Sequence, residues 1–431
     1  PGGFWPVALS DGLRSDTPGL IWTGRQSAGY AATAHYISLL PAAAAPRGAI
    51  ITWSGYVRAG LVHENARKDN DKSKYRWDAV SGGWVRDASY DGADDEHIGD
   101  ISVKARGQIR VTAKNATSLG EVGIDIRLRE NFSGNGAAAI YSDVAWGYWA
   151  MTHELTFGTG YDASLGKLGT GLNGDCVCYY TDNSGISLDP GDVTQLRLSY
   201  GAGPFKVAGA LEDASFRAKG DDYDAGEERN GDRLGAAGKI SYSGDQIYGE
   251  ISGVWRDFQD YEDVYNIHAL WQIGAGLRLS AGSVAMLSLA VAHGGGPVEN
   301  IYEGEIIRSS AQDNSWWGAS GLASAELTDS IHAEMGAGYM VRKLDRYSDR
   351  DGNDTNGGDG SEWTALSGLY YNPVDQLTIG IEGEWTDTRF TDSVFHEGAP
   401  APGNGQKPEY KYDVDVHTTS LTLDVVSVWR F

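Results

Sequence analysis

The sequence contains no uninterrupted apolar run that approaches the roughly 18 residues a membrane-spanning helix requires. A helical membrane protein is therefore excluded. The same absence carries no weight against membrane-spanning strands. Their residues alternate between lipid and an aqueous lumen, so such strands are only moderately hydrophobic on average.

Cysteine is nearly absent, since Cys176 and Cys178 are the two in a chain of 431 residues. Two cysteines are too few for a disulfide framework, and two thiols are too few for a thiolate metal site. Two alternatives remain for the pair: free thiols, or one very small disulfide where the loop turns sharply. We expect the disulfide.

Basic residues are outnumbered, with 35 Lys and Arg against 59 Asp and Glu and a formal net charge of −24. This balance opposes non-specific binding to nucleic acid, which we exclude as a partner. Much of the acidic excess lies in residues 91–96, 221–228 and 349–359, which we expect to form exposed loops.

Catalytic signatures are missing as well. The chain has no Gly-x-Ser-x-Gly elbow, no His-Glu-x-x-His pair and no Walker-type Gly-Lys-Ser/Thr. We therefore predict that it is not an enzyme and requires no cofactor. A partial calcium-loop pattern stands at Asp349, Asp351 and Asn353, which place oxygen ligands at alternate positions. Gly360 occupies the twelfth position, where such a loop carries Glu, so a solvated acidic loop is the alternative to a Ca²⁺ site.

Period-two alternation is the dominant pattern that is present. Gly occurs 59 times, Tyr 23 times and Trp 14 times, a composition that suits many strands and turns. From Ala49 onward we identify sixteen alternating segments. They are residues 51–64, 98–114, 119–130, 138–151, 155–165, 193–200, 205–214, 233–243, 246–258, 264–280, 284–293, 315–327, 330–343, 362–371, 377–390 and 414–431.

The links between these segments alternate in length. Short links fall at residues 115–118, 152–154, 201–204, 244–245, 281–283, 328–329 and 372–376, and most links at the opposite joins are long. Outer-membrane barrels have this asymmetry, with short periplasmic turns at one rim and longer loops at the other. A soluble β-sandwich has no reason to keep it. We therefore predict an all-β fold, a transmembrane antiparallel β-barrel of about sixteen strands, with eighteen as the other count.

The faces of the strands are visible in residues 98–114, where Ile101, Val103 and Ile109 alternate with Lys104 and Arg106. In a barrel the apolar face meets lipid and the charged face lines the lumen, although a soluble sandwich gives the same alternation. Aromatic residues near segment ends predict girdles at the headgroup level. The candidates are Trp53, Trp146, Tyr148, Trp255, Tyr265, Trp316, Trp317, Trp385 and Trp429.

Residues 1–48 have weak periodicity, and we treat them as an N-terminal extension of uncertain structure before a barrel domain of residues 49–431. The last strand ends on Trp429 and Phe431, which resembles the assembly signal of Gram-negative outer-membrane proteins. Residues 54–60, 105–107 and 174–182 resemble the general porin family of alpha-proteobacteria, and the resemblance spans most of the barrel domain.

The resemblance implies a homotrimer of sixteen-stranded barrels in the outer membrane of a Gram-negative bacterium, in contact with its lipid and lipopolysaccharide. It also implies that the third long loop folds into the pore as a constriction. Residues 166–192 occupy that position, and a flexible outer loop is the alternative. The loop carries the acidic residues Asp175, Asp182, Asp189 and Asp192.

Basic side chains gather on the predicted lumen face of the early strands. Facing the loop carboxylates, they would create a transverse field across a narrow passage. The alternative is a set of solvated local ion pairs, each worth at most about 1 kcal/mol. The residues are Arg58, Lys104, Arg106, Arg110, Arg127, Arg129 and Arg197.

These patterns lead to one functional prediction and two alternatives. We predict a porin, a water-filled channel for passive diffusion of small polar solutes and ions. The first alternative is a substrate-selective outer-membrane channel for sugars or acidic saccharides. The second is a soluble β-protein that binds glycans.

Overall fold

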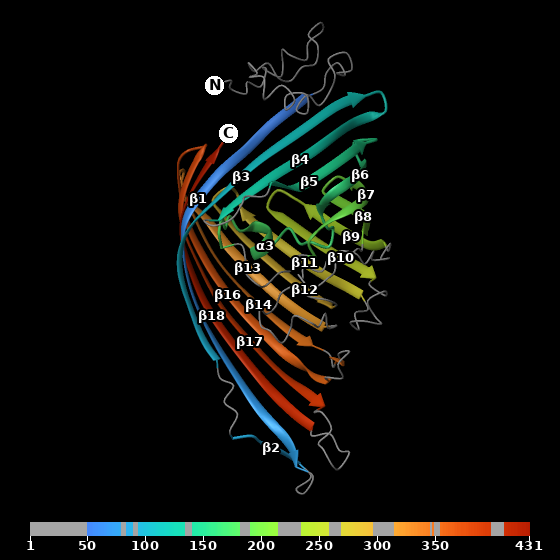
Figure 1. Ribbon diagram of the computed structural model, residues 1–431. Coiled ribbons are helices and arrows are strands. Elements are labelled where there is room, and N and C mark those ends of the chain that lie inside the picture. Colours follow the sequence, from blue (N-terminus) through green and yellow to red (C-terminus); the bar gives the residue numbers. More distant parts are fainter. Residues whose placement is uncertain are drawn as a thin grey trace, which may run out of the picture.

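The computed structural model describes residues 50–78, 83–88, 94–133, 140–181, 190–213, 234–257, 269–295, 314–344, 347–348, 354–397 and 409–431. Within these ranges the strands form one antiparallel sheet that closes on itself (Figure 1). Strand β1 (Ile50–Asp78) closes it by pairing with both β3 (Asp94–Thr117) and β18 (Glu409–Arg430). The predicted N-terminal extension, residues 1–48, lies outside the described residues.

Sixteen long strands form the wall, which confirms the predicted fold and strand number. Two short strands, β2 (Gly83–Arg86) and β15 (Tyr347–Ser348), pair with β1 and β16. Together with the sixteen long strands they make up the eighteen strands of the described sheet. The remaining strands are β4 (Gly120–Ser133), β5 (Ile140–Ala150), β6 (Leu155–Ala163), β7 (Asp192–Ala202), β8 (Phe205–Asp213), β9 (Leu234–Ser243), β10 (Ile247–Asp257), β11 (Ala269–Ala281), β12 (Ala285–Gly295), β13 (Asn314–Thr328), β14 (Ile331–Leu344), β16 (Asp354–Val374) and β17 (Leu377–Glu397).

Short turns connect the strands at one rim, as the link lengths predict. The turn between β7 and β8 and the turn between β11 and β12 each contain a glycine with positive φ, Gly203 at 57° and Gly282 at 62°. Glycine adopts this conformation without the steric cost that other residues meet. Most of the connections at the opposite rim lie outside the described residues.

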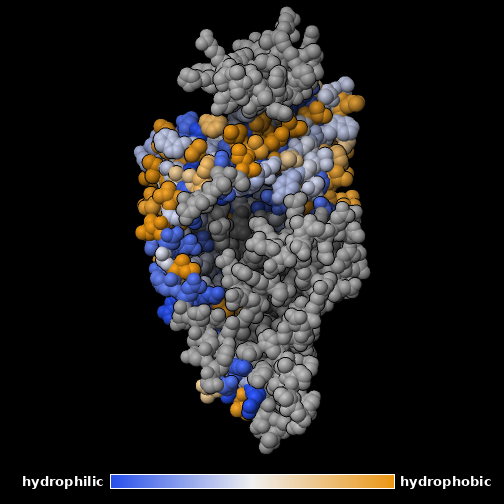
Figure 2. All heavy atoms as spheres, viewed as in Figure 1, coloured by the Kyte–Doolittle hydropathy of each residue, from blue (hydrophilic) through white to orange (hydrophobic). Residues whose placement is uncertain are grey.

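The two faces of the wall differ in polarity. On the outer face, Ile101 and Ile251 expose 67% and 58% of their surface, while the alternate residues Glu250 and Ser252 are buried on the inner side. Figure 2 shows apolar side chains gathered on the outer surface in the upper part of the view. A soluble protein would bury these side chains, whereas a lipid-facing wall exposes them.

The aromatic residues confirm only part of the predicted girdles. Trp255, Trp317, Trp385 and Trp429 are exposed on the outer face. The prediction is wrong for three residues, because Trp146, Tyr148 and Trp316 point into the barrel. Trp146 lies beneath Arg197, Tyr148 donates a hydrogen bond to Glu121, and Trp316 is buried beside Met340. Position near a strand end does not fix which face a residue occupies.

Five neighbouring strands extend well beyond a bilayer. Strand β1 has 29 residues, and β3, β16, β17 and β18 have 21 to 24. A membrane strand needs about 9–11 residues. The ends of these strands that extend beyond the membrane-spanning length are rich in charged residues, as residues 64–78 illustrate. On this side of the barrel the sheet therefore continues into water. These long strands run toward the lower end of Figure 1.

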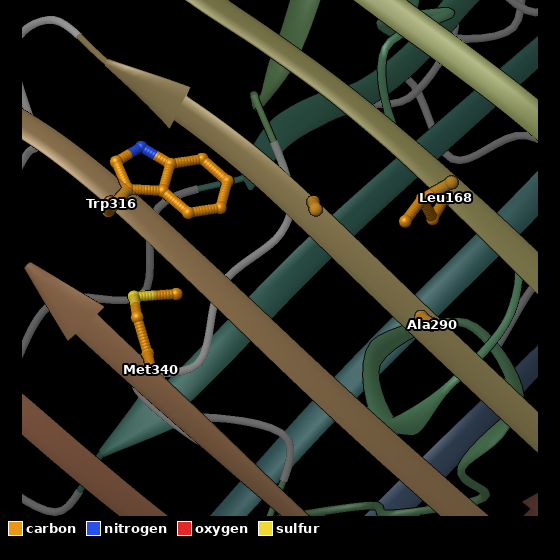
Figure 3. Close-up of a cluster of buried hydrophobic side chains, with 5 residues drawn as sticks. Leu168, Ala290, Trp316 and Met340 are labelled. Carbon is orange, nitrogen blue, oxygen red and sulfur yellow. The ribbon is translucent and has the colours of Figure 1, made fainter.

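The hydrophobic core lies between the wall and the connection from β6 to β7. We call residues 164–181 of this connection the inner loop. Leu168 of the inner loop forms one buried cluster with Ala290 and Ala292 of β12, Trp316 of β13 and Met340 of β14 (Figure 3). The small alanines in the wall leave the volume that the loop side chain fills. The loop is therefore packed inside the barrel, as the resemblance implies.

Among the described residues, no helix is long and apolar enough to span a bilayer. The inner loop contains one helical turn, α3 (Leu172–Asp175).

A substitution pair on β3 tests the facing of the wall. Ile109→Arg places a charge on the lipid side, where it costs about 2–4 kcal/mol near the bilayer midplane. Thr112→Arg places the same charge on the lumen side, directly opposite Asp125 in the β3–β4 register, and is expected to cost little. Urea unfolding of both variants refolded into lipid vesicles measures the difference. Equal losses of unfolding free energy would contradict the assigned faces.

Candidate functional site

The inner loop follows the inside of the wall around most of its circumference. Its backbone amides and hydroxyls donate hydrogen bonds to buried side chains on successive strands, from β8 to β17. It finally reaches β3, where the Tyr180 hydroxyl donates to the Lys104 carbonyl oxygen at 3.1 Å. The lumen is consequently narrowed by a belt of chain that is held at many points.

The first anchor of the inner loop is Glu212 on β8, whose side chain is fully buried. Its carboxylate accepts from the Ser164 hydroxyl at 2.7 Å and from the Leu165 amide at 3.2 Å. Arg256 of β10 neutralises it from the other side at 2.8 Å. A buried carboxylate needs such a charge partner and several donors to offset its desolvation.

The middle of the loop, around α3, is held by β10, β12 and β13. Glu250 accepts from the Gly169 amide at 2.6 Å and from the Thr170 hydroxyl at 3.0 Å. The Gly171 amide donates to Ser288 at 2.7 Å. Gly171 has a φ of 75°, and a Cβ there would meet Ser320 and Ala290, so the close approach to the wall requires glycine.

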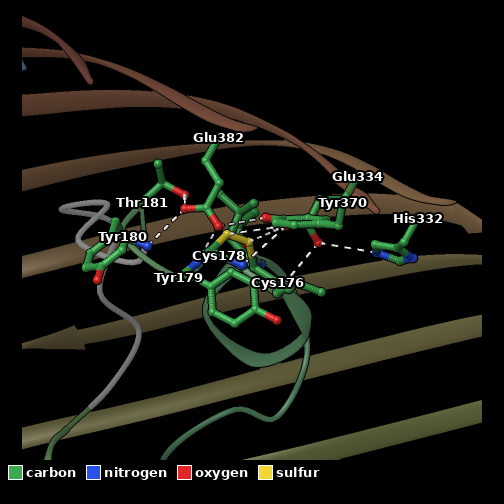
Figure 4. Close-up of a disulfide and its surroundings, with 12 residues drawn as sticks. Cys176, Cys178, Tyr179, Tyr180, Thr181, His332, Glu334, Tyr370 and Glu382 are labelled. Carbon is green, nitrogen blue, oxygen red and sulfur yellow. Dashed lines mark hydrogen bonds and ion pairs between the residues drawn. A yellow bond between two sulfur atoms is a disulfide. The ribbon is translucent and has the colours of Figure 1, made fainter. Parts of the chain in front are cut away.

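The end of the loop is held by two buried carboxylates on β14 and β17 (Figure 4). Glu334 accepts from the amides of Val177 and Cys178 at 3.0 and 3.3 Å. Glu382 accepts from the amides of Tyr179 and Tyr180 at 2.7 and 2.9 Å. Four consecutive backbone donors are thereby satisfied inside the barrel. Away from water, unpaired donors would each cost about 1–3 kcal/mol.

Tyr370 of β16 connects these two carboxylates. Its hydroxyl lies 2.8 Å from Glu334 and 3.0 Å from Glu382, and its ring is almost fully buried. The Tyr179 ring stacks edge-on against it at 5.7 Å between centroids. The residue therefore joins the two anchors into one unit.

The structure joins Cys176 and Cys178 by a disulfide, with 5.2 Å between their Cα atoms. Cys178 is buried among Leu172, Leu322 and Leu366, between α3 and the wall. Both sulfurs lie beside Glu334, and these three residues are the one group of potential metal ligands that we find within the described ranges. Since the disulfide engages both sulfurs, the group has no thiolate to offer a metal.

The acidic residues of the loop do not line up opposite the predicted basic cluster. Asp175 turns to the wall, where Arg278 of β11 donates to it at 2.9 Å and Ser288 also contacts it. The expectation that Asp175 faces the early strands is therefore wrong, because the loop path brings it to a different arginine. Asp192 is exposed at the start of β7. Asp182 and Asp189 lie outside the described residues, as do the calcium candidates Asp349, Asp351 and Asn353.

The structure places all seven predicted basic residues on the lumen face. Arg58 lies directly opposite Arg106 in the β1–β3 register, and Arg110 lies opposite Arg127 in the β3–β4 register. The remaining members are Lys104 on β3, Arg129 on β4 and Arg197 on β7. The cluster therefore forms one continuous surface on β1, β3 and β4, with Arg197 further round the wall.

Several of these cations have local carboxylate partners. Arg110 forms a two-point pair with Asp125, and Arg127 and Arg129 lie 3.1 and 2.7 Å from Asp143. Arg197 lies 3.3 Å from Asp162. These four residues form local ion pairs of the kind that the alternative describes. That alternative does not describe Lys104 and Arg106, for which no such pair occurs in the described part of the chain.

Tyr180 is the contact between the inner loop and the basic surface. The Arg58 guanidinium lies over its ring, 4.6 Å from the centroid. The ring fills the space that a side chain at Gly60 would occupy. Burial raises the pKa of the Tyr180 hydroxyl, while the nearby positive charges of Arg58 and Arg106 act in the opposite direction. Both guanidinium groups therefore lie within electrostatic reach of this phenol.

Sequence reasoning did not identify the wall residues that hold the loop: Glu212, Glu250, Glu334, Glu382 and Arg278. A signal was available, because each is a charged residue on the inner face of a strand whose outer face is apolar. Such a residue needs a partner inside the barrel. Which loop atom supplies it cannot be read from the alternation.

The fold is similar to that of two outer-membrane proteins of known structure. One is a loop L8 deletion mutant of OmpT, an outer membrane protein of Vibrio cholerae, with a TM-score of 0.52 and 10% identity, covering 89% of this chain and 99% of that chain. The other is the outer membrane channel DcaP of Acinetobacter baumannii, with a TM-score of 0.53 and 12% identity, covering 90% and 98%. No protein-family model and no curated protein matches the sequence.

At these identities the likeness establishes the fold alone. The barrel resembles an outer membrane protein and an outer membrane channel of known structure. The comparisons do not single out the alpha-proteobacterial family that the short sequence motifs resemble.

Removing one hydroxyl tests the anchoring of the loop. Tyr370→Phe leaves Glu334 and Glu382 without their shared donor, at a cost of about 1–1.5 kcal/mol. Hydrogen exchange of the amides of residues 177–180 is expected to accelerate about tenfold in this variant. Tyr371→Phe is the matched control, since Tyr371 is exposed on the outer face. Unchanged exchange in Tyr370→Phe would contradict the anchoring role.

Alkylation tests the disulfide. Denatured protein treated with iodoacetamide is expected to gain no mass before reduction and two carbamidomethyl groups after it. Two groups added without reduction would show that Cys176 and Cys178 are free thiols.

Proposed function

We propose that this chain is a porin of the Gram-negative outer membrane, through which small hydrophilic solutes and ions diffuse passively. The observation that supports it most directly is the closed sheet with an apolar exterior and a charged interior narrowed by the inner loop. Such a barrel provides an aqueous path through lipid without exposing backbone polar groups to the hydrocarbon. The proposal includes no chemical step and no cofactor, in keeping with the lack of catalytic motifs.

The proposal extends to a homotrimer in contact with outer-membrane lipid and lipopolysaccharide. Its support is the resemblance of the sequence to general porins and the broad apolar outer face, which can meet either lipid or a second copy. Membership of the alpha-proteobacterial porins is part of the same proposal and rests on the short motifs alone.

The soluble glycan-binding alternative is less well supported. Outward residues such as Ile101, Val103 and Ile251 expose about half or more of their surface on neighbouring and distant strands alike. Exposed apolar surface of this extent is a liability in water. A solute-selective channel is favoured by a different observation, which we develop below: Lys104 and Arg106 form no ion pair with any described residue.

Within this proposal, the basic surface sets the preference for anions. Two lumen charges are removed together in Arg106→Ala/Arg110→Ala, which we expect to shift the reversal potential in a KCl gradient toward cation selectivity. The double variant Arg67→Ala/Arg389→Ala is the control, because it removes equal charge from side chains that are 66% and 65% exposed on the outer side of the hydrated sheet. Planar-bilayer recording measures both.

Two results would count against these ideas in different ways. Unchanged selectivity in Arg106→Ala/Arg110→Ala would remove the role of the basic surface. Failure of the refolded wild-type chain to conduct ions at all would reject the porin.

A further inference from the structure

Lys104 and Arg106 differ from the other cations of the lumen. Arg110, Arg127, Arg129 and Arg197 each have a carboxylate partner. In the described part of the chain, neither Lys104 nor Arg106 forms an ion pair. The Arg106 Nε donates to the side-chain oxygen of Asn131, a neutral partner. Among the described residues, no acceptor contacts its two Nη atoms.

The two cations lie together on one face of β3. They are two residues apart, which corresponds to about 7 Å along a strand. Arg58 stands directly across from Arg106 on β1. Arg58 itself lies over the Tyr180 ring, so Lys104 and Arg106 stand beside the edge of the inner loop.

Among the described residues, no carboxylate is in ion-pair contact with Lys104 or Arg106. Glu382 and Asp424 are each only 1% exposed, although the charge of Lys104 acts on Asp424. Glu64 and Asp100 are exposed, but they face each other four residues further along β1 and β3 than Gly60 and Lys104. That separation is about 13 Å along the strands. Within the part of the chain that the structure describes, Lys104 and Arg106 are therefore cations beside Tyr180 that no carboxylate contacts directly.

We propose that Lys104 and Arg106, flanked by Asn131 and by the Tyr180 edge of the inner loop, form a binding subsite for the carboxylate group of a small organic solute such as a sugar acid. This inference rests on the proposed function. The planar guanidinium of Arg106 presents two parallel donors that match a carboxylate, and Lys104 adds a second charge. Asn131 fixes the guanidinium from the side, so little conformational entropy is lost when the anion binds. A neutral sugar of the same size finds no such partner.

The subsite predicts saturable block of ion current by sugar acids. The full-length chain is refolded and recorded in planar bilayers in KCl, with sodium gluconate or glucose added over a range of concentrations. Gluconate is expected to reduce the current to a plateau, and glucose at equal concentration is expected to leave no plateau. In Arg106→Gln and in Lys104→Gln, the half-blocking gluconate concentration is expected to rise about tenfold or more, because a charge-assisted contact is lost.

Lys114→Gln is the matched control. Lys114 lies on the same strand and the same face, ten residues from Lys104, and it already pairs with Glu121 at 3.7 Å. The half-blocking gluconate concentration of the Lys114→Gln channel is expected to equal that of the wild type. Heat-modifiable migration in detergent gels verifies that each variant is a folded barrel.

The outcomes separate the subsite from the porin. A channel that conducts without saturable gluconate block overturns the subsite and leaves the porin proposal intact. Equal block in wild type, Arg106→Gln and Lys104→Gln also overturns it, because the block then arises elsewhere. A folded chain that does not conduct rejects the porin and, with it, the subsite.

Discussion

Hydrogen-bond saturation of the backbone is the constraint on which this structure depends. In lipid no water is present to satisfy an unpaired amide or carbonyl, so a sheet can cross the bilayer only if it has no free edge. Here β1 meets both β3 and β18, which removes the edge. Once the sheet is closed, alternation along each strand sends every second side chain outward to lipid and the others into the lumen. The polarity of the two faces follows from this closure.

The same constraint governs the inner loop. A loop without regular structure carries many backbone donors, and inside a barrel they need acceptors. Glu212, Glu250, Glu334 and Glu382 supply these on successive strands, and each carboxylate is itself covered by the loop. The loop and the acidic wall thus satisfy each other. Four acidic side chains are covered in the process.

Features that depend on local spacing can be predicted from the sequence, whereas contacts between residues far apart in the chain cannot. The seven basic residues were placed on the correct face, because period-two alternation is local and strong on β3 and β4. Asp175 was assigned to the wrong partner, since its contact with Arg278 joins residues about a hundred positions apart. The prediction that Trp146 and Trp316 belong to the aromatic girdles was wrong for a related reason. Their position near strand ends suggested an interfacial role, while parity along the strand directs them inward.

The sequence by itself determined the class of the fold, the sixteen strands, the rim of short turns and the two faces of the wall, because all of these follow from spacing along the chain. Tertiary structure decided where the inner loop runs, which carboxylates hold it and which cations keep a carboxylate partner. Those features depend on the curvature that brings distant strands around a common lumen. Alternation predicts that Lys104 and Glu382 both face inward, but only the closed barrel shows that Glu382 binds the backbone of the inner loop while Lys104 forms no ion pair with a described residue.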